Sequence, residues 1–377
     1  MLRTICAADA PVSRAAVAEL TGLTRSTVSR LVDSLVAGGL VAELATAVPG
    51  GPGRPATPLR PAGVTVALGL EVNVESTSVR VLDLAGTLVA QETTSGDLAG
   101  SDPERVLPAL GASARRVLHD LGPAYRPVGA ALALPGLVSA EDRVLLRAPN
   151  LAWADVDVAR LLPPPDLGGL AVQVGNEASL GALTVALERP GRLGELRDFV
   201  YLSGEVGIGG AVVRDGVVLT GRHGWAGELG HVGVDPRGPA CRCGSTGCLE
   251  RYAGREPLLA AIGLPPEADP RELVRRARDG DPAALRAAAT AAWALGVALA
   301  SVINVVDVPA VVLGGHLAVL HEVVADDLAA LLSARVISAG WRSPTVHAHP
   351  GDPASGALGA ALAELERVIA DPLPWCG

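Results

Sequence analysis

Residues 227–250 read GELGHVGVDPRGPACRCGSTGCLE, and no other segment of the 377-residue chain says more about its fold. Four side chains in this stretch are candidate metal ligands: His231, Cys241, Cys243 and Cys248. Three thiolates and one imidazole suit tetrahedral zinc, and a site whose four positions are all filled by protein is structural. Free or disulfide-bonded thiols are the alternative. The sequence therefore predicts a structural zinc site at these four residues.

The chain on both sides of this stretch repeats one order of predicted elements. Each half has three strands, one or more helices and a further strand: strands 64–70, 78–84, 88–91 and 128–134 with helix 103–121, then strands 199–202, 209–213, 217–219 and 310–313 with helices 255–262, 270–278 and 282–304. Strands followed by crossover helices indicate α/β lobes, and ligands of such folds bind in the crevice between the parts. We predict a first lobe over 62–175, completed by a C-terminal helix within 354–377, and a second lobe over 176–353 that holds the zinc site.

The composition is that of a globular protein with one basic end. Apolar residues make up 49% of the chain and charged residues 19%, which excludes intrinsic disorder, and five cysteines are too few for a disulfide scaffold. The first 60 residues carry six Arg and four acidic residues, whereas the whole chain has a formal charge of −9. A basic end on an acidic body is compatible with a head that faces nucleic acid.

One uncharged segment, 287–306, has the length of a membrane span. Its Thr, Ser and Asn residues and its high alanine content favour a buried helix instead. The N-terminus lacks the charged leader and apolar core of a secretion signal. We therefore expect a cytoplasmic protein with reduced cysteines and no membrane partner.

Residues 1–61 have the pattern of a winged helix-turn-helix. Helices over 14–20 and 24–36 are joined by a tight glycine turn, and apolar segments 40–44 and 57–60 predict a two-stranded wing. The candidate DNA-binding residues lie on the second helix and at the wing tip: Arg25, Ser26, Thr27, Ser29, Arg30 and Arg54. These donors suit the phosphates and base edges of double-stranded DNA, and a small helical dimerisation module is the alternative.

Several short motifs together resemble the ROK family, named for repressors, open reading frames and kinases. The stretch 227–231, followed by Cys241-x-Cys243-Gly244-x-x-Gly247-Cys248-x-Glu250, resembles the family signature. Further matches in the expected order extend the likeness over essentially the whole chain: Pro135-Gly136, Asn176-Glu177-Ala178, 200–210 and Leu313-Gly314-Gly315. The resemblance implies an α/β body of the actin-like ATPase type, with two ribonuclease-H-like lobes that close on a sugar-binding cleft.

The resemblance also implies which residues bind the sugar. Positions matching Asn176, Glu228, His231 and Glu250 hold sugar hydroxyls in the family, the turn at Gly136 contributes backbone, and Glu177 stands at the position of the kinase base. Carboxylates beside an amide are suitable bidentate partners for adjacent hydroxyls. His231 would bind zinc through one nitrogen and the sugar through the other, which links the two sites mechanically.

Three departures from the kinase pattern fall at the phosphoryl-transfer positions. Where the kinases have Asp-x-Gly-Gly-Thr, this chain has Glu71-Val72-Asn73-Val74-Glu75, and Glu75 would repel phosphate. The second phosphate loop, usually Gly-Thr-Gly, reads Gly204-Glu205-Val206-Gly207. The base, usually Asp, is Glu177, and a base achieves nothing without a placed phosphoryl donor. We expect no ATP cofactor and no catalysis.

These features predict a sugar-responsive transcriptional regulator, most simply a repressor of carbohydrate-utilisation genes. The expected partners are a double-stranded DNA operator and a small sugar effector that is bound but not phosphorylated. A homodimer or homotetramer would span half-sites about one helical turn apart, or a multiple of it. The alternatives are an ATP-dependent sugar kinase with an appended DNA-binding head, and a regulator that no longer responds to sugar.

Overall fold

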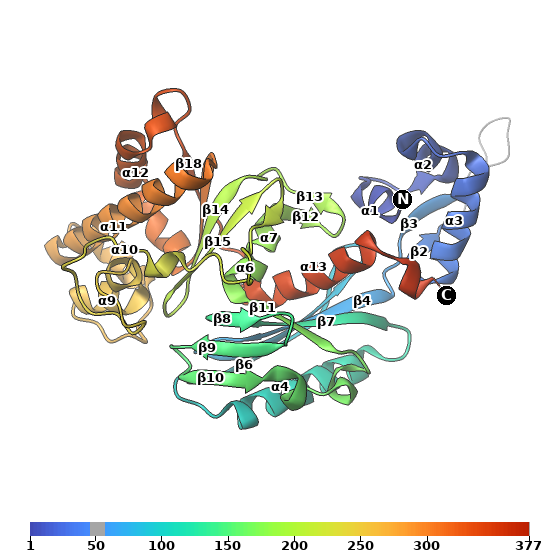
Figure 1. Ribbon diagram of the computed structural model, residues 1–377, viewed down its shortest axis with the longest axis horizontal. Coiled ribbons are helices and arrows are strands. Elements are labelled where there is room, and N and C mark those ends of the chain that lie inside the picture. Colours follow the sequence, from blue (N-terminus) through green and yellow to red (C-terminus); the bar gives the residue numbers. More distant parts are fainter. Residues whose placement is uncertain (46–56, 377) are drawn as a thin grey trace.

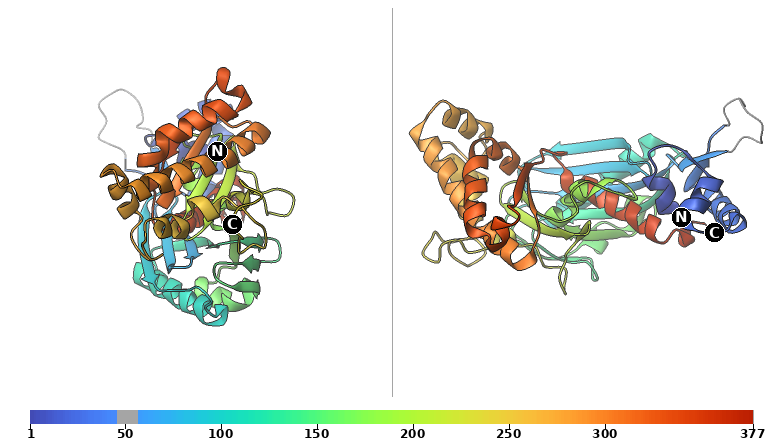
Figure 2. Two further views of the ribbon diagram at one scale, coloured as in Figure 1. Left: turned by 90° about the vertical axis from the view of Figure 1, so that its left-hand side faces the viewer. Right: turned by 90° about the horizontal axis from the view of Figure 1, so that it is seen from above.

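The computed structural model describes residues 1–45 and 57–376, so that the predicted wing-tip residue Arg54 lies outside the described residues. Figure 1 shows two α/β lobes and a smaller head, and both chain termini lie at the head. The further views in Figure 2 place the head at one end of an elongated molecule. The predicted fold class, a helix-turn-helix head followed by a two-lobed α/β body, is confirmed.

The head contains three helices and a small antiparallel sheet of order β1-β3-β2: α1 (Leu2–Ala7), α2 (Arg14–Thr21), α3 (Arg25–Ala37), β1 (Val12–Ser13), β2 (Val41–Glu43) and β3 (Pro58–Pro61). The Ser13 hydroxyl caps α2 by accepting a hydrogen bond from the Ala16 amide, and Gly22 ends this helix in the left-handed conformation. The Thr24 hydroxyl caps α3 by accepting from the Thr27 amide. The predicted turn and caps are therefore present, and β1 adds a third strand to the predicted wing.

The first lobe is built on a five-stranded sheet of order β11-β7-β4-β5-β6. Its strands are β4 (Thr65–Val72), β5 (Ser76–Asp83), β6 (Leu88–Ser95), β7 (Arg126–Leu134) and β11 (Val172–Asn176). Val66, Leu68 and Leu70 alternate along β4 and pack against α4 (Pro103–Leu121). A smaller antiparallel sheet adjoins this lobe and consists of β8 (Leu137–Ser139), β9 (Val144–Ala148) and β10 (Trp153–Asp157).

The second lobe repeats the arrangement with a five-stranded sheet of order β16-β15-β14-β17-β18. Its strands are β14 (Phe199–Gly204), β15 (Ile208–Arg214), β16 (Val217–Val218), β17 (Ala310–Gly315) and β18 (Thr345–Ala348). Its helices are α8 (Glu250–Ala253), α9 (Arg255–Ala261), α10 (Arg271–Arg278), α11 (Pro282–Val306) and α12 (His316–Arg335). Helix α12 was not predicted from the sequence.

Helix α11 contains the apolar segment 287–306. Within the described residues it is the one helix long and apolar enough to cross a membrane. Its buried alanine and leucine side chains pack with α10 and α12 in the core of the second lobe. It is therefore a core helix of this lobe, as its composition indicated.

Helix α13 (Ser355–Ala370) runs between the two lobes towards the head (Figures 1 and 2). It packs against β4 and β7 of the first lobe. On its other side it packs against α6 (Glu177–Gly181), which belongs to the predicted second lobe. A Cβ built on Gly69 of β4 would lie 1.7 Å from the carbonyl oxygen of Ala357, and one built on Gly359 would lie 1.9 Å from that of Leu180. Only glycine permits this backbone contact. The prediction gave this helix to the first lobe alone, and the structure adds contacts with α6 and the head.

Candidate functional site

A pocket of about 270 Å³ opens between the two lobes. It is lined by every residue predicted to bind sugar: Gly136, Asn176, Glu177, Glu228, His231 and Glu250. These residues come from the turn after β7, the junction of β11 with α6, the loop after β16 and the start of α8. This volume is sufficient for a single sugar ring.

Asn176 connects two parts of the pocket wall, the start of α6 and the turn at Gly136, and has one N–H donor left. Its Oδ1 accepts hydrogen bonds from the amides of Ala178 and Ser179, which caps α6. Its Nδ2 donates to the Gly136 carbonyl oxygen at 3.0 Å. A side-chain amide has two N–H donors, so one remains for a ligand hydroxyl.

Glu228, His231 and Glu250 form the polar wall of the second lobe. The Nε2 atom of His231 lies 3.9 Å from a Glu228 carboxylate oxygen, and its Nδ1 lies 3.6 Å from Glu250 Oε1. Burial raises the pKa of Glu228, and so does the charge of Glu250, whereas His231 lowers it. Paired acceptors of this kind suit the adjacent hydroxyls of a sugar.

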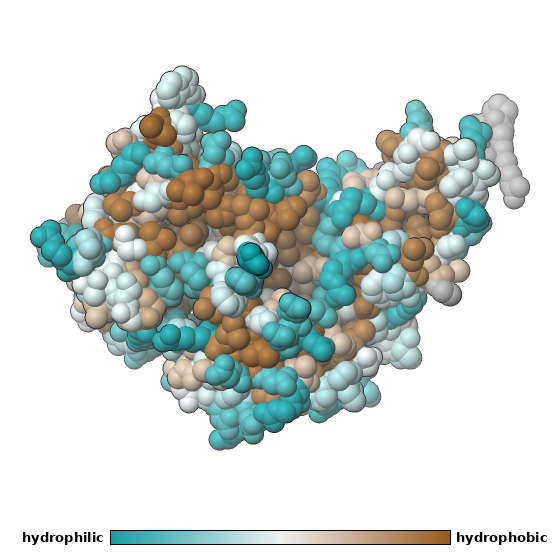
Figure 3. Space-filling view, viewed as in Figure 1, coloured by the Kyte–Doolittle hydropathy of each residue, from teal (hydrophilic) through white to brown (hydrophobic). Residues whose placement is uncertain are grey.

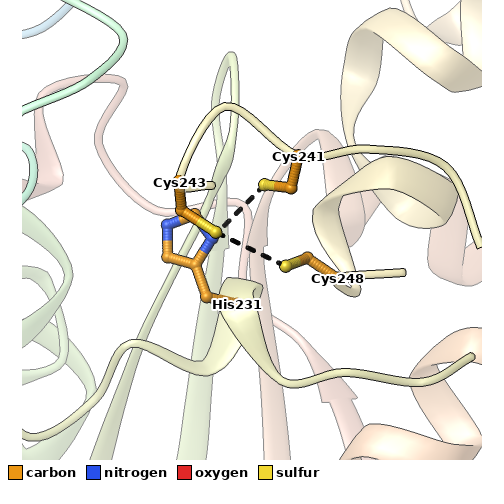
Figure 4. Close-up of side chains that lie close together, drawn as sticks. All are labelled: His231, Cys241, Cys243 and Cys248. Carbon is orange, nitrogen blue, oxygen red and sulfur yellow. Dashed lines mark hydrogen bonds between the residues drawn. The ribbon is translucent and has the colours of Figure 1, made fainter. Parts of the chain in front are cut away.

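Four possible metal ligands meet directly behind this wall (Figure 4): His231, Cys241, Cys243 and Cys248. Their ligand atoms all lie within 4.8 Å of one another. The Cys241 Sγ is 3.7 Å from His231 Nδ1, and the Sγ atoms of Cys243 and Cys248 are also 3.7 Å apart. Tetrahedral zinc with bonds of about 2.3 Å requires ligand atoms about 3.7 Å apart, so these residues fit the ion.

The metal cluster and the pocket share two residues, His231 and Cys243. The Nδ1 atom of His231 faces the cysteines, while its Nε2 faces Glu228 in the pocket. Glu250 lies between the two, because its Oε1 accepts from the Cys241 thiol at 2.9 Å. This arrangement supports the predicted double role of His231 and couples the loop 231–250 to the pocket.

Three carboxyl groups crowd the side of the cleft where a kinase would bind phosphate. Burial raises the pKa of Glu71 to about 7, and burial together with the charges of Glu71 and Glu75 raises that of Glu205 to about 8. Burial, together with the charges of Glu71, Glu205 and Glu228, holds the pKa of Glu177 well above its ordinary value. A protonated Glu177 can donate a hydrogen bond but cannot accept a proton from a hydroxyl.

An ion pair bridges the two lobes beside these carboxyls. Arg255 at the start of α9 donates to both carboxylate oxygens of Glu75, one of them at 2.8 Å. The sequence predicted a free Glu75 charge that repels phosphate; the structure corrects this, because Arg255 neutralises that charge and lowers the pKa of Glu75. The Arg255 guanidinium and the Glu75 carboxylate thus bond to each other, and fewer of their hydrogen-bonding groups remain for a nucleotide phosphate.

Three polar residues near the pocket were not predicted: Arg147, Asn150 and Arg255. The first two line the pocket from β9 and the loop after it. Arg255 pairs with a residue 180 positions away in the chain. No local pattern marks these residues, because their neighbours in space come from other elements.

The candidate DNA-binding face lies on α3. Arg25, Ser26 and Arg30 are exposed, and Thr27 and Ser29 are half-buried. Within residues 1–45 and 57–376, neither Arg25 nor Arg30 makes an ion pair. Arg14 of α2, in contrast, pairs with Asp33 and Glu43. Two guanidinium groups on the second helix are therefore available for phosphates or base edges.

We predict that Cys243→Ser removes zinc from the protein. A hydroxyl is a poor replacement for a thiolate ligand, so bound zinc should fall from about one equivalent to a small fraction. Metal analysis after dialysis measures this, and hydrogen exchange should rise in 231–250. Cys376→Ser, far from the cluster in sequence, is the matched control. Equal zinc content in the two variants would exclude Cys243 as a ligand.

We predict that Glu71→Gln flattens the pH dependence of stability. The pKa of Glu71 is higher in the folded protein than in the unfolded chain, where it is near 4.5, so folding is favoured at low pH and this contribution is lost as the pH rises through about 7. The variant should be more stable than the wild type at pH 8 by about 2–3 kcal/mol and equal at pH 4. Urea unfolding at both pH values measures this, with Glu141→Gln, an exposed carboxylate, as control. Parallel pH profiles would contradict the assignment.

Comparisons with known proteins agree with the geometry. The family model described as the ROK family matches residues 67–366, and the model of the IclR helix-turn-helix domain matches residues 1–45. The xylose repressor of Bacillus subtilis is 27% identical over 332 residues, which cover 88% of this chain and 85% of the repressor.

Solved structures show the same fold. A ROK family transcriptional regulator, a homologue of the E. coli MLC protein, covers 100% of this chain and 97% of its own with a TM-score of 0.82 at 23% identity. The ROK hexokinase of Thermus thermophilus is 31% identical and covers 79% of this chain and 97% of its own, with a TM-score of 0.63. Because the family model spans both lobes, the chain belongs to the ROK family and carries an IclR-type helix-turn-helix domain at its N-terminus.

Proposed function

We propose that this ROK family chain is a sugar-responsive DNA-binding repressor that binds its effector without phosphorylating it. One observation carries the proposal: the cleft keeps the sugar-binding residues, whereas its phosphate side holds crowded carboxyls and the Glu75–Arg255 ion pair. The name of the relative in Bacillus subtilis makes xylose the first sugar to test. We further propose a cytoplasmic homodimer or homotetramer with a structural zinc ion, divided into a head at 1–61, a first lobe at 62–175 with α13, and a second lobe at 176–353.

A sugar kinase is the second candidate, because the ROK hexokinase is 31% identical. Phosphoryl transfer needs a donor placed in line with the attacking hydroxyl and charges that stabilise the transferred group. A transferred phosphoryl group is negative and needs positive charge around it. Glu71, Glu177 and Glu205 are negative when ionised and uncharged when protonated. The geometry therefore favours the repressor.

The body holds the head through a β-hairpin formed by β12 (Leu187–Arg189) and β13 (Arg192–Leu193). The Arg189 guanidinium donates to the carbonyl oxygens of Cys6, Ala7 and Ala8, at 3.2, 3.1 and 2.8 Å. These carbonyls form the C-terminal end of α1, where a cation is favourable. The hairpin thus caps a helix of the DNA-binding head.

The same hairpin is joined closely to the pocket. Helix α6 begins at the pocket residue Glu177, and α7 (Leu183–Ala186) leads directly into β12. At the hairpin tip the Gly191 amide donates to Glu366 of α13, which also pairs with Arg3 of α1 at 2.9 Å. A ligand that shifts α6 would therefore shift the support of α1, provided that it binds one arrangement better than the other.

The first test separates the repressor from the kinase. We expect one sugar in a panel that includes xylose, glucose and N-acetylmannosamine to raise the melting temperature of zinc-replete protein, because a ligand that binds only the folded state stabilises it. ATP with magnesium should add nothing, and no sugar phosphate should form. A stabilisation that requires ATP, or measurable phosphate transfer, would instead establish a kinase.

We predict that Arg30→Ala weakens DNA binding and leaves sugar binding unchanged. Loss of one guanidinium contact should reduce affinity for DNA fragments selected by the wild-type protein by about 5- to 100-fold. Fluorescence anisotropy at fixed salt measures this. Arg105→Ala, at an exposed position of α4, is the control. Wild-type affinity in Arg30→Ala would remove this residue from the interface.

We predict that Arg189→Met uncouples the sugar from the DNA. The substitution keeps most of the apolar stem and removes the three hydrogen bonds of Arg189 to the end of α1, leaving only that of Arg192 to the Ala7 carbonyl oxygen. Sugar should therefore still bind, while its effect on DNA affinity should shrink. Anisotropy titrations with and without sugar measure the coupling, and Arg197→Met, an exposed residue beyond the hairpin, is the control. A full sugar response in Arg189→Met would show that the signal takes another route.

A further inference from the structure

An exposed aromatic pair lies on the loop 219–227, which precedes the pocket residue Glu228. The Trp225 side chain is 44% exposed. Its ring centroid lies 4.9 Å from that of His223, with 32° between the ring planes. Trp225 belongs to none of the hydrophobic clusters formed by the described residues. The two adjacent rings offer an exposed flat surface on which a ligand can stack.

The loop reaches from the second lobe to the pocket wall of the first. A Cβ built on Gly224 would lie 3.9 Å from the carbonyl oxygen of Val138 on β8. Leu137, the preceding residue of that strand, lines the pocket, and so does Glu228 on the opposite side. The segment 224–228 therefore runs from a position beside β8 to the pocket residue Glu228, and Trp225 lies within this segment.

The base of the loop is closed by its own backbone. The Ala226 amide donates to the Thr220 carbonyl oxygen at 3.1 Å. This bond limits the positions that the aromatic pair can take relative to Glu228. In Figure 3, hydrophobic residues gather across the middle of the face shown, around the hollow at its centre.

The size of the pocket indicates what the aromatic pair would contact. Its volume of about 270 Å³ is enough for one sugar ring, and a second ring linked to the first would extend towards the opening of the pocket. The C–H face of a sugar ring is apolar, and an indole offers a flat apolar surface against which it can stack. A monosaccharide confined to the pocket would not need this surface.

We propose that Trp225, backed by His223, is a stacking platform for a second sugar unit, so that the effector is a disaccharide or a longer oligosaccharide whose terminal ring fills the pocket. This inference rests on the proposed function, since it takes the pocket to be a sugar site. It extends that function by naming the class of effector, a disaccharide or longer oligosaccharide, and the residue that selects it, Trp225.

The test compares matched pairs of sugars by calorimetry on the zinc-replete full-length protein: xylose with xylobiose, and glucose with cellobiose. In at least one pair the disaccharide should bind about 3- to 10-fold more tightly than its monosaccharide. Trp225→Ala should abolish this difference without weakening the monosaccharide, and Trp225→Phe should retain most of it. Trp341→Ala is the matched control, because Trp341 is 89% exposed and follows helix α12 of the second lobe, far in the chain from the loop that precedes Glu228.

Glu228→Gln separates this inference from the proposed function. It should weaken the monosaccharide and the disaccharide alike, because Glu228 lies in the pocket itself. If monosaccharides bind and depend on Glu228, but disaccharides bind no better or keep their advantage in Trp225→Ala, the platform is wrong and the sugar pocket stands. If neither these sugars nor N-acetylmannosamine binds the wild-type protein, the proposed sugar site fails and the platform with it.

Discussion

The backbone approach of α13 to both of its neighbours is the constraint on which the rest of the structure depends. At Gly69 and Gly359 no side-chain atom separates the helix from β4 or from α6, so its position relative to both is fixed by direct backbone contact. From this position the Ala357 amide donates to Glu71 in the cleft, and Glu366 reaches the head. One helix therefore links the phosphate side of the cleft, the element that begins at the pocket, and the DNA-binding head.

The two sides of the cleft have opposite chemistry. On the sugar side, Asn176 and Glu228 present free hydrogen-bonding groups to a pocket of defined size. On the other side, Glu75 and Arg255 bond to each other across the lobes, and the carboxyls around them are pushed towards their neutral forms by burial and mutual repulsion. In the proposed function, a cleft of this kind binds a sugar on one side and offers no positive field for a triphosphate on the other.

Besides the ion pair of Arg3 with Glu366, apolar contacts and hydrogen bonds attach the head to the body. Apolar side chains of the head and of α13 share one core, which gives cohesion without a strong directional preference. Arg189 adds hydrogen bonds to three successive carbonyl oxygens of α1, and these depend on angle as well as distance. A small rotation of the hairpin would therefore change the orientation of the head more readily than it would detach it.

Local chemistry in the sequence determined the elements and the clusters that lie close together along the chain. The caps at Ser13 and Thr24, the repeated order of strands and helices, and the metal-ligand spacing of 231–248 each depend on residues within a few turns of one another. The pocket residues were identified only through the family resemblance, and helix α12 was missed because its apolar residues are spread around the helix instead of forming one stripe. The ion pair between Glu75 and Arg255, the double packing of α13 and the position of the loop 219–227 were decided by the tertiary structure. Each joins residues far apart in the chain, and no pattern within either segment encodes the partner that packing brings to it.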